Sequence, residues 1–168
     1  EELKLAKNLL INSGVNLIES KAQNLKAIND NSIDIVLCHW ALTLMDPIAP
    51  VLNEVRRVLT SEGRFAALVD GPMNAVPSYK EVHDLIYSYV QKEIPSYGEI
   101  DLGDARIRGT ESLSNLVHKT FPEANVTIET NVVSLQGPVI QVAEIAAGFF
   151  YAAFVLKPDK RKSMITSL

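Results

Sequence analysis

Three short polar segments stand where the strands of a predicted sheet would end. His39 and Asp70 each follow an apolar run, and Lys21 follows a third. An imidazole such as that of His39 can act as a general base near neutral pH, but a histidine at a strand end is more often structural or lines a bound ligand. Asp70 is suited either to contact a polar substrate or to cap the turn at Gly71.

Aromatic side chains in the second half of the chain form a further group of candidates. Tyr79 and His83 belong to an amphipathic segment that follows Asp70. Tyr79 stands at a helical spacing typical of a core residue, and His83 is suited to face either a cleft or solvent. Four more aromatic residues indicate an apolar pocket, a homodimer surface or simple packing: Phe149, Phe150, Tyr151 and Phe154.

The alternation of apolar runs with amphipathic segments predicts strands joined by helices. Residues 15–19, 33–38 and 64–69 are predicted as strands, and 126–135 as another. Strands that alternate with helices are typical of βαβ units and a parallel sheet. Ligands of such sheets bind beyond the carboxyl ends of the strands, where the polar candidates stand.

The clearest predicted helix covers residues 46–60. Asp46 is a good N-cap, and Pro47 suits the first helical position. Glu62-Gly63 then predicts a turn before the next strand. A long apolar helix is predicted from Val139 to Leu156, where Glu144 argues against a membrane span.

Composition limits the classes of function. The chain has 168 residues, 47% of them hydrophobic and 21% charged, as expected of a globular protein with a real core. Its net charge of −4 argues against nucleic acid as a partner. The single cysteine, Cys38, excludes an intramolecular disulfide and fits a cytoplasmic protein. The spacing of the histidines predicts no metal site.

The stretch from Ser32 to Phe65 resembles class I S-adenosylmethionine (SAM) dependent methyltransferases. It is most similar to the small-molecule branch that includes enzymes of ubiquinone and menaquinone biosynthesis. The matching positions are a strand with Asp-x-Val, an Ala-Leu pair, a Glu-x-x-Arg-Val-Leu helix and a Gly-Arg-Phe strand start: Asp34, Val36, Ala41, Leu42, Glu54, Arg57, Val58, Leu59, Gly63, Arg64 and Phe65.

This resemblance implies an α/β fold with a doubly wound, mostly parallel Rossmann-like sheet. The family's Gly-x-Gly-x-Gly loop and the acidic residue of its second strand have no counterpart in the sequence, so we expect the sheet to be incomplete at the N-terminus, and at the C-terminus as well. One partial methyltransferase domain is expected over residues 1–168, with a lid or insertion at about 73–110 and a helical segment at about 138–168.

The resemblance also implies the roles of individual residues. SAM is the expected cofactor, held by two segments: Lys21, Ala22, Gln23, and Cys38, His39, Trp40. A small, partly apolar acceptor is expected beside Asp70, Tyr79 and His83. His39 is a candidate base, although a cofactor-lining role is preferred. Relatives carry acidic side chains where this chain has Lys21 and Gln23, which favours the alternative of a non-catalytic methyltransferase-like binding or interaction module.

Overall fold

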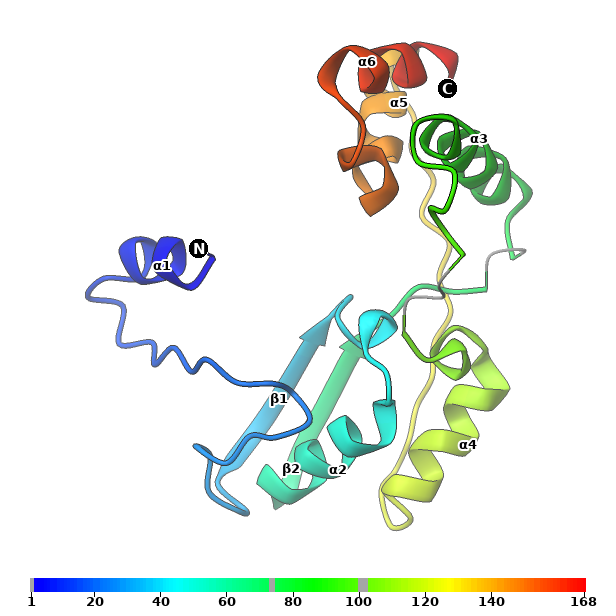
Figure 1. Ribbon diagram of the computed structural model, residues 1–168. Helices are drawn as coiled ribbons and strands as arrows, with labels where there is room; N and C mark the ends of the chain where they lie inside the picture. The colour runs from blue at the N-terminus through cyan, green and yellow to red at the C-terminus, as the bar shows by residue number, and fades with distance from the viewer. Residues whose placement is uncertain (1, 73–74, 100–102) are drawn as a thin grey trace.

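Two parallel strands form the sheet of the computed structural model, which describes residues 2–72, 75–99 and 103–168. β1 spans Ile33–His39 and β2 spans Leu59–Leu68 (Figure 1). Val36 pairs with Phe65, and His39 with Leu68. The predicted strands at 33–38 and 64–69 and their parallel direction are therefore confirmed.

β2 begins earlier than predicted, because the Glu62-Gly63 turn lies inside the strand. Ile33 pairs with Leu59, but Ile35 pairs with Arg64, so β2 holds extra residues that have no partner on β1. Gly63 lies in this irregular stretch. A Cβ there would come within 2.9 Å of the Thr60 carbonyl oxygen, so the bend can tighten only around a glycine.

Helix α2 (Ile48–Val58) connects the two strands and covers one face of the sheet. Its buried side chains recur at intervals of three and four residues and so lie on one face: Ile48, Val51, Leu52, Val55 and Val58. The prediction that Asp46 caps this helix is wrong. Pro47 is the N-cap, with a non-helical ψ of 142°, and no side chain makes a capping hydrogen bond. Asp46 therefore lies one residue outside the helix.

The core beneath α2 is a group of buried side chains that we call the Leu42 cluster, namely Leu42, Ile48, Val51, Leu52, Ile107 and Leu116. Ile107 comes from the 3₁₀ turn η2 (Ala105–Arg108), and Leu116 from helix α4 (Thr110–Thr120). Phe65 of β2 packs against this cluster. Residues from several parts of the chain thus share one core with the sheet.

Arg57 ties the loop before β1 to the end of α2. Its guanidinium donates to the carbonyl oxygens of Ile28 and Leu25, both at 3.0 Å. It also forms ion pairs with Asp30 and with Glu54, 2.9 Å from Nε to the Glu54 carboxylate. Glu54 accepts a hydrogen bond from the Leu25 N–H at 2.6 Å. Glu54 and Arg57 lie one helical turn apart on α2, and their hydrogen bonds and ion pairs therefore fix the loop before β1 in place.

The strands predicted at 15–19 and 126–135 are not formed. Both segments are extended chain without strand pairing. Val15 is 54% exposed and Val133 is 81% exposed, so neither segment buries the apolar residues that suggested a strand. A strand needs a hydrogen-bonded neighbour, and neither segment has one among the described residues.

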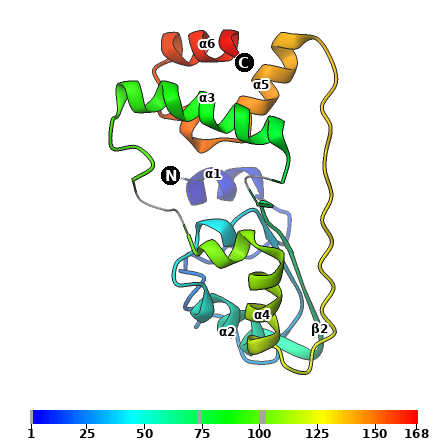
Figure 2. The same ribbon diagram turned by 90° about the vertical axis from the view of Figure 1, so that its right-hand side faces the viewer.

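A second group of helices forms a separate cluster, which Figure 2 shows beyond the end of the sheet. It contains α3 (Pro77–Glu93), α5 (Val139–Gly148), the 3₁₀ turn η3 (Tyr151–Phe154) and α6 (Pro158–Ser167). Its core, the Phe150 cluster, is built around large side chains from these elements: Ile86, Val90, Phe150, Leu156 and Met164, with Ala147, Ala152 and Ala153. The extended chain after α4 runs up to α5.

The helix predicted from Val139 to Leu156 is wrong in its length. It ends at Gly148, and a short 3₁₀ turn follows. Phe150 is 8% exposed and lies between these two pieces, so the break lets its ring enter the core. Among the described residues, no helix is both long and apolar enough to cross a bilayer.

The segment around η2 also lies against the turn that follows β1. This turn is η1 (Leu42–Leu44). The Asp104 N–H donates to the Met45 carbonyl oxygen at 3.1 Å, and Gly103 lies directly on the Thr43 carbonyl. Parts of the predicted lid, at 73–74 and 100–102, lie outside the described residues. Helix α1 (Glu2–Leu9) lies apart from the sheet, with Leu5 60% exposed.

Replacing Glu54 by glutamine should reduce the acid sensitivity of the fold. Hydrogen bonds from Arg57 and from the Leu25 N–H lower the pKa of Glu54 from 4.5 to about 2. Because the folded state lowers this pKa, the stabilisation is complete above the unfolded pKa and is lost as the pH falls from 4.5 toward 2. We expect Glu54→Gln to lower the urea midpoint at pH 7 and to flatten its decline below pH 4.5.

The matched control is Glu123→Gln, at an exposed position in the loop after α4. It should leave both the midpoint and its pH dependence unchanged. Equal behaviour of the two variants would contradict a stabilising role for the Glu54 carboxylate.

Gly103→Ala should destabilise the fold. Gly103 has a left-handed φ of 74°, and a Cβ would collide with the Thr43 carbonyl. We expect a loss of more than about 1 kcal/mol in the free energy of unfolding, measured by urea denaturation. Gly148→Ala is the control, because a Cβ there would meet no atom within 4 Å outside its chain neighbours and the backbone of α5. It should be neutral or stabilise by up to about 1 kcal/mol. An unchanged free energy of unfolding in Gly103→Ala would show that the Thr43 carbonyl leaves room for a Cβ at this position.

Candidate functional site

The turn after β1 carries a tryptophan in a strained backbone conformation. The Trp40 N–H continues the sheet by donating to the Leu68 carbonyl oxygen at 2.9 Å. Its φ is 51°, in the left-handed region, which is uncommon for a bulky side chain. The Thr43 hydroxyl donates to the Trp40 carbonyl oxygen at 3.2 Å and supports this turn. Strained residues of this kind gather at functional sites.

Aromatic contacts connect the end of β1 with the helical cluster. The His39 and Trp40 rings have centroids 4.8 Å apart. Trp40 meets the edge of Phe149, which directly follows α5, at 5.5 Å. His39 is exposed, whereas Trp40 is half-buried. The predicted pair therefore lies where the sheet meets the helical cluster.

Cys38 faces the opposite side of the sheet from His39. Its side chain packs against the Leu42 cluster under α2. Successive side chains of a strand point to opposite faces, so the two neighbours separate. The thiol of Cys38 is thus a core group, and only its backbone faces the turn at Trp40.

The segment Lys21–Gln23 forms a tight turn. The Asn24 N–H donates to the Lys21 carbonyl oxygen at 2.9 Å, and the Ser20 hydroxyl bonds to the Asn24 carbonyl. Ala22 packs against the Leu42 cluster, as Cys38 does. The structure therefore brings two of the predicted segments against one core. Lys21 is exposed and Gln23 is half-buried.

Asp70 and Tyr79 are close enough to influence each other. Burial raises the pKa of Tyr79, and the negative charge of Asp70 raises it further. The Tyr79 ring also lies 5.3 Å from that of Phe150, centroid to centroid. The carboxylate beyond β2 is thus near enough to the phenol of α3 to influence it, and their predicted role beside an acceptor stays a prediction.

His83 lies one helical turn beyond Tyr79 and is part of an aromatic stack. Its ring stacks on Tyr87 with centroids 4.0 Å apart and lies 6.0 Å from Phe150. Its Nδ1 is 3.1 Å from the Asp84 carboxylate. These contacts hold the imidazole within the helical cluster. Packing alone therefore explains the position of His83 as well as the predicted contact with a substrate does.

Arg108 is a site residue that the sequence analysis missed. Its guanidinium donates to the Thr43 carbonyl oxygen at 3.2 Å. Its positive charge also lowers the pKa values of Tyr79 and Tyr87, against the dominant effect of burial, which raises both. The sequence pointed to Arg108 only as a basic residue just before a helix, within a segment whose pattern predicts a loop.

These groups form a junction between the sheet and the helical cluster. Asp70 beyond β2 and Arg108 of η2 both influence the Tyr79 phenol of α3, and the Trp40 and Phe149 rings are in contact. Such a set can orient a polar ring by hydrogen bonds while its apolar faces exclude water. The described residues hold no group of three or more His, Cys, Asp or Glu side chains that could bind a metal.

Comparison with known proteins shows a family similarity for the part of the chain that contains the sheet. Residues 1–67 match the family described as "Methyltransferase domain". The match runs from α1 into β2 and covers less than half of the 168 residues, so the helical cluster lies outside it. Searches of curated proteins and of solved structures found no match.

Charge changes at the junction should move the pKa of Tyr79 in opposite directions. Asp70→Asn should lower it by removing a negative charge, and Arg108→Gln should raise it by removing a positive one. The measurement is an NMR titration of ¹³C-labelled tyrosine. Asp159→Asn, an exposed change on α6, should have no effect. A Tyr79 titration that is identical in all variants would show that neither charge faces the phenol.

Proposed function

We propose that this chain transfers a methyl group from SAM to a small, partly apolar acceptor. The observation that carries the proposal is the match of residues 1–67 to a methyltransferase domain. The matched region ends within β2 and includes Trp40, whereas Asp70, Tyr79 and Arg108 lie beyond it. We place the protein in the small-molecule branch, on its resemblance to ubiquinone and menaquinone biosynthesis enzymes, and take the paired strands as part of a doubly wound sheet.

In this proposal, SAM lies against the two segments that meet the Leu42 cluster. The residues of the turn fit the adenine end of the cofactor. Ala22 is anchored on an apolar core and offers a small surface for a flat ring, and the half-buried Gln23 amide has a carbonyl oxygen that can accept from the adenine amine. Lys21 contributes backbone contacts. SAM supplies an electrophilic methyl group on a sulfonium.

The segment Cys38–Trp40 would line the other half of the cofactor. Cys38 would contribute backbone groups, because its thiol packs in the core. The Trp40 ring would form a wall, fixed by Phe149 at 5.5 Å. His39 is assigned a lining role rather than that of a base, because positioning alone supports many methyl transfers.

The acceptor would lie beside Asp70 and Tyr79, with His83 one turn away on α3. A tyrosine has an ordinary pKa of about 10 and keeps its proton at neutral pH. Burial and Asp70 raise the pKa of Tyr79 further, and its phenol can therefore donate a hydrogen bond to the acceptor. Asp70 can accept one. We propose the whole chain as one partial domain, with the segment at about 73–110 as a lid and 138–168 as its helical partner.

A non-catalytic binding module is the second candidate. Lys21 and Gln23 stand where similar enzymes carry acidic residues, and this change weakens the expected contacts to adenine. A binding module would hold SAM weakly or not at all and would transfer no methyl group. Measuring binding and transfer together separates the two functions.

The test compares wild type with His39→Ala. Calorimetric titration with SAM and S-adenosylhomocysteine gives affinity, and labelled-methyl transfer to a panel of phenols, amines and carbon acids gives turnover. We expect His39→Ala to weaken SAM binding and to leave turnover at saturating SAM close to wild type. A base role would instead lower turnover by roughly 10²–10⁴-fold.

The matched control is His118→Ala, at an exposed histidine on α4. It should change neither affinity nor turnover. Absence of both binding and transfer in the wild type would overturn the proposed function, and binding without transfer would favour the module.

A further inference from the structure

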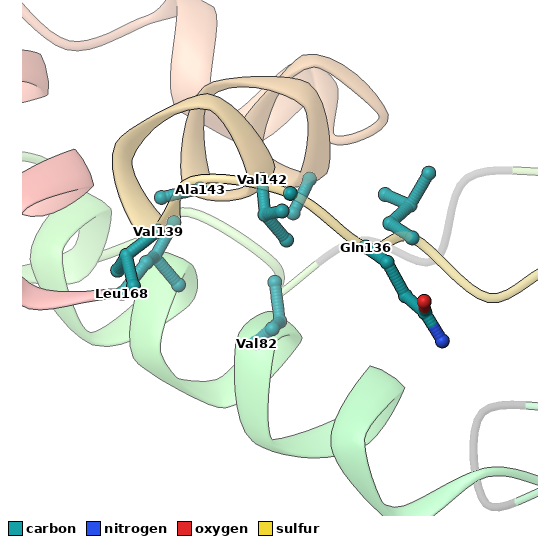
Figure 3. A pocket seen from close by; sticks show the side chains of 9 residues that line it. Val82, Gln136, Val139, Val142, Ala143 and Leu168 are labelled. Atoms are coloured by element: carbon teal, nitrogen blue, oxygen red, sulfur yellow. The ribbon is translucent and has the colours of Figure 1, made fainter.

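A hollow of about 460 Å³ lies between α3 and α5 (Figure 3). Val82 of α3 forms one wall, and a face of α5 forms the opposite wall. Leu135 and Leu168 contribute from the extended chain and from the residue that follows α6. The hollow is open to solvent on its outer side, since Val139 and Leu135 in its lining are 80% and 40% exposed.

The pattern of residue sizes on α5 creates this space. Val139, Val142, Ala143 and Ala146 line the hollow, and their spacing of three and four residues places them on one face of the helix. Ala143 is buried and Ala146 is half-buried, so small side chains form the α5 side of the hollow.

The lining suits a hydrocarbon and no ionic group. Among the described residues that line the hollow, Gln136 has the only polar side chain, and none is charged. Its amide lies apart from the valines in Figure 3. A charged head group inside would lose its hydration without a partner, whereas a hydrocarbon would lose nothing.

The hollow adjoins the acceptor side of the junction. Val82 directly precedes His83 in sequence and lies one helical turn from Tyr79. A molecule with a polar head beside Tyr79 can therefore extend an apolar chain along α3. A docked helix from a second protein would need a longer groove than a hollow of this volume.

We propose that this hollow binds the unbranched alkyl or acyl chain of a small molecule. That this chain belongs to the methyl acceptor rests on the proposed function. The binding itself does not, because it requires neither SAM nor methyl transfer. The hollow then selects acceptors by the length of their apolar tail.

The test is an NMR titration of methyl-labelled protein with 1-hexanol, 1-octanol and 1-decanol. Shifts should concentrate on Val82, Val139 and Val142. Each added methylene should tighten binding about fourfold until the hollow is full. No dependence on chain length, or shifts centred elsewhere, would overturn the proposal.

Two variants fill the hollow from opposite walls. Ala146→Leu and Val82→Phe should each weaken 1-decanol binding by about tenfold or more, because each occupies space that the chain needs. Gln141→Leu is the control, since it adds a leucine to α5 outside the lining and should leave affinity unchanged. If one filling variant does not fold, the other decides.

Two further outcomes separate this proposal from the proposed function. Methyl transfer by a protein that does not bind the alkanols would overturn the alkyl site alone. Length-dependent alkanol binding by a protein without methyl transfer would support the site and overturn only the assigned acceptor. A change of oligomeric state in Ala146→Leu, with no alkanol binding by wild type, would assign the hollow to a second copy and overturn the proposal.

Discussion

The parallel pairing of β1 with β2 is the constraint on which the arrangement of the sheet and of α2 depends. Because both strands run in the same direction, the chain must return from the end of β1 to the start of β2, and α2 makes that return. The end of α2 then meets the loop before β1. Arg57 holds the two together through carbonyl oxygens and carboxylates, since a guanidinium offers several donors in one plane.

The same constraint determines where the polar side chains meet. Both strands end at one edge of the sheet, so Trp40 and Asp70 project toward the same junction. The left-handed turn at Trp40 directs its ring to Phe149, and Asp70 acts on the phenol of Tyr79. Arg108 reaches the junction through Thr43. The Trp40–Phe149 ring contact and the Arg108–Thr43 hydrogen bond thus join the end of β1 to elements from the second half of the chain.

The local pattern of apolar residues was sufficient to predict those helices and strands that bury one face against a neighbouring element. The helix predicted at 46–60 formed as α2, and the apolar runs at 33–38 and 64–69 formed in β1 and β2, although the bounds of α2 and β2 differ from those predicted. The runs at 15–19 and 126–135 have the same apolar character, but they remain extended and exposed. Whether such a run becomes a strand depends on a hydrogen-bonding partner, and that partner is not encoded in the run itself.

By itself, the sequence determined which residues could form strands and helices, and the candidates Ala22, His39, Asp70 and Tyr79. The tertiary structure decided which of them meet. It turned Cys38 into the core and His39 away from it, because strand side chains alternate. It also brought Arg108 and Phe149 to the junction. Contacts between residues so distant in the chain depend on how the elements pack, and residue spacing along the sequence carries no record of that packing.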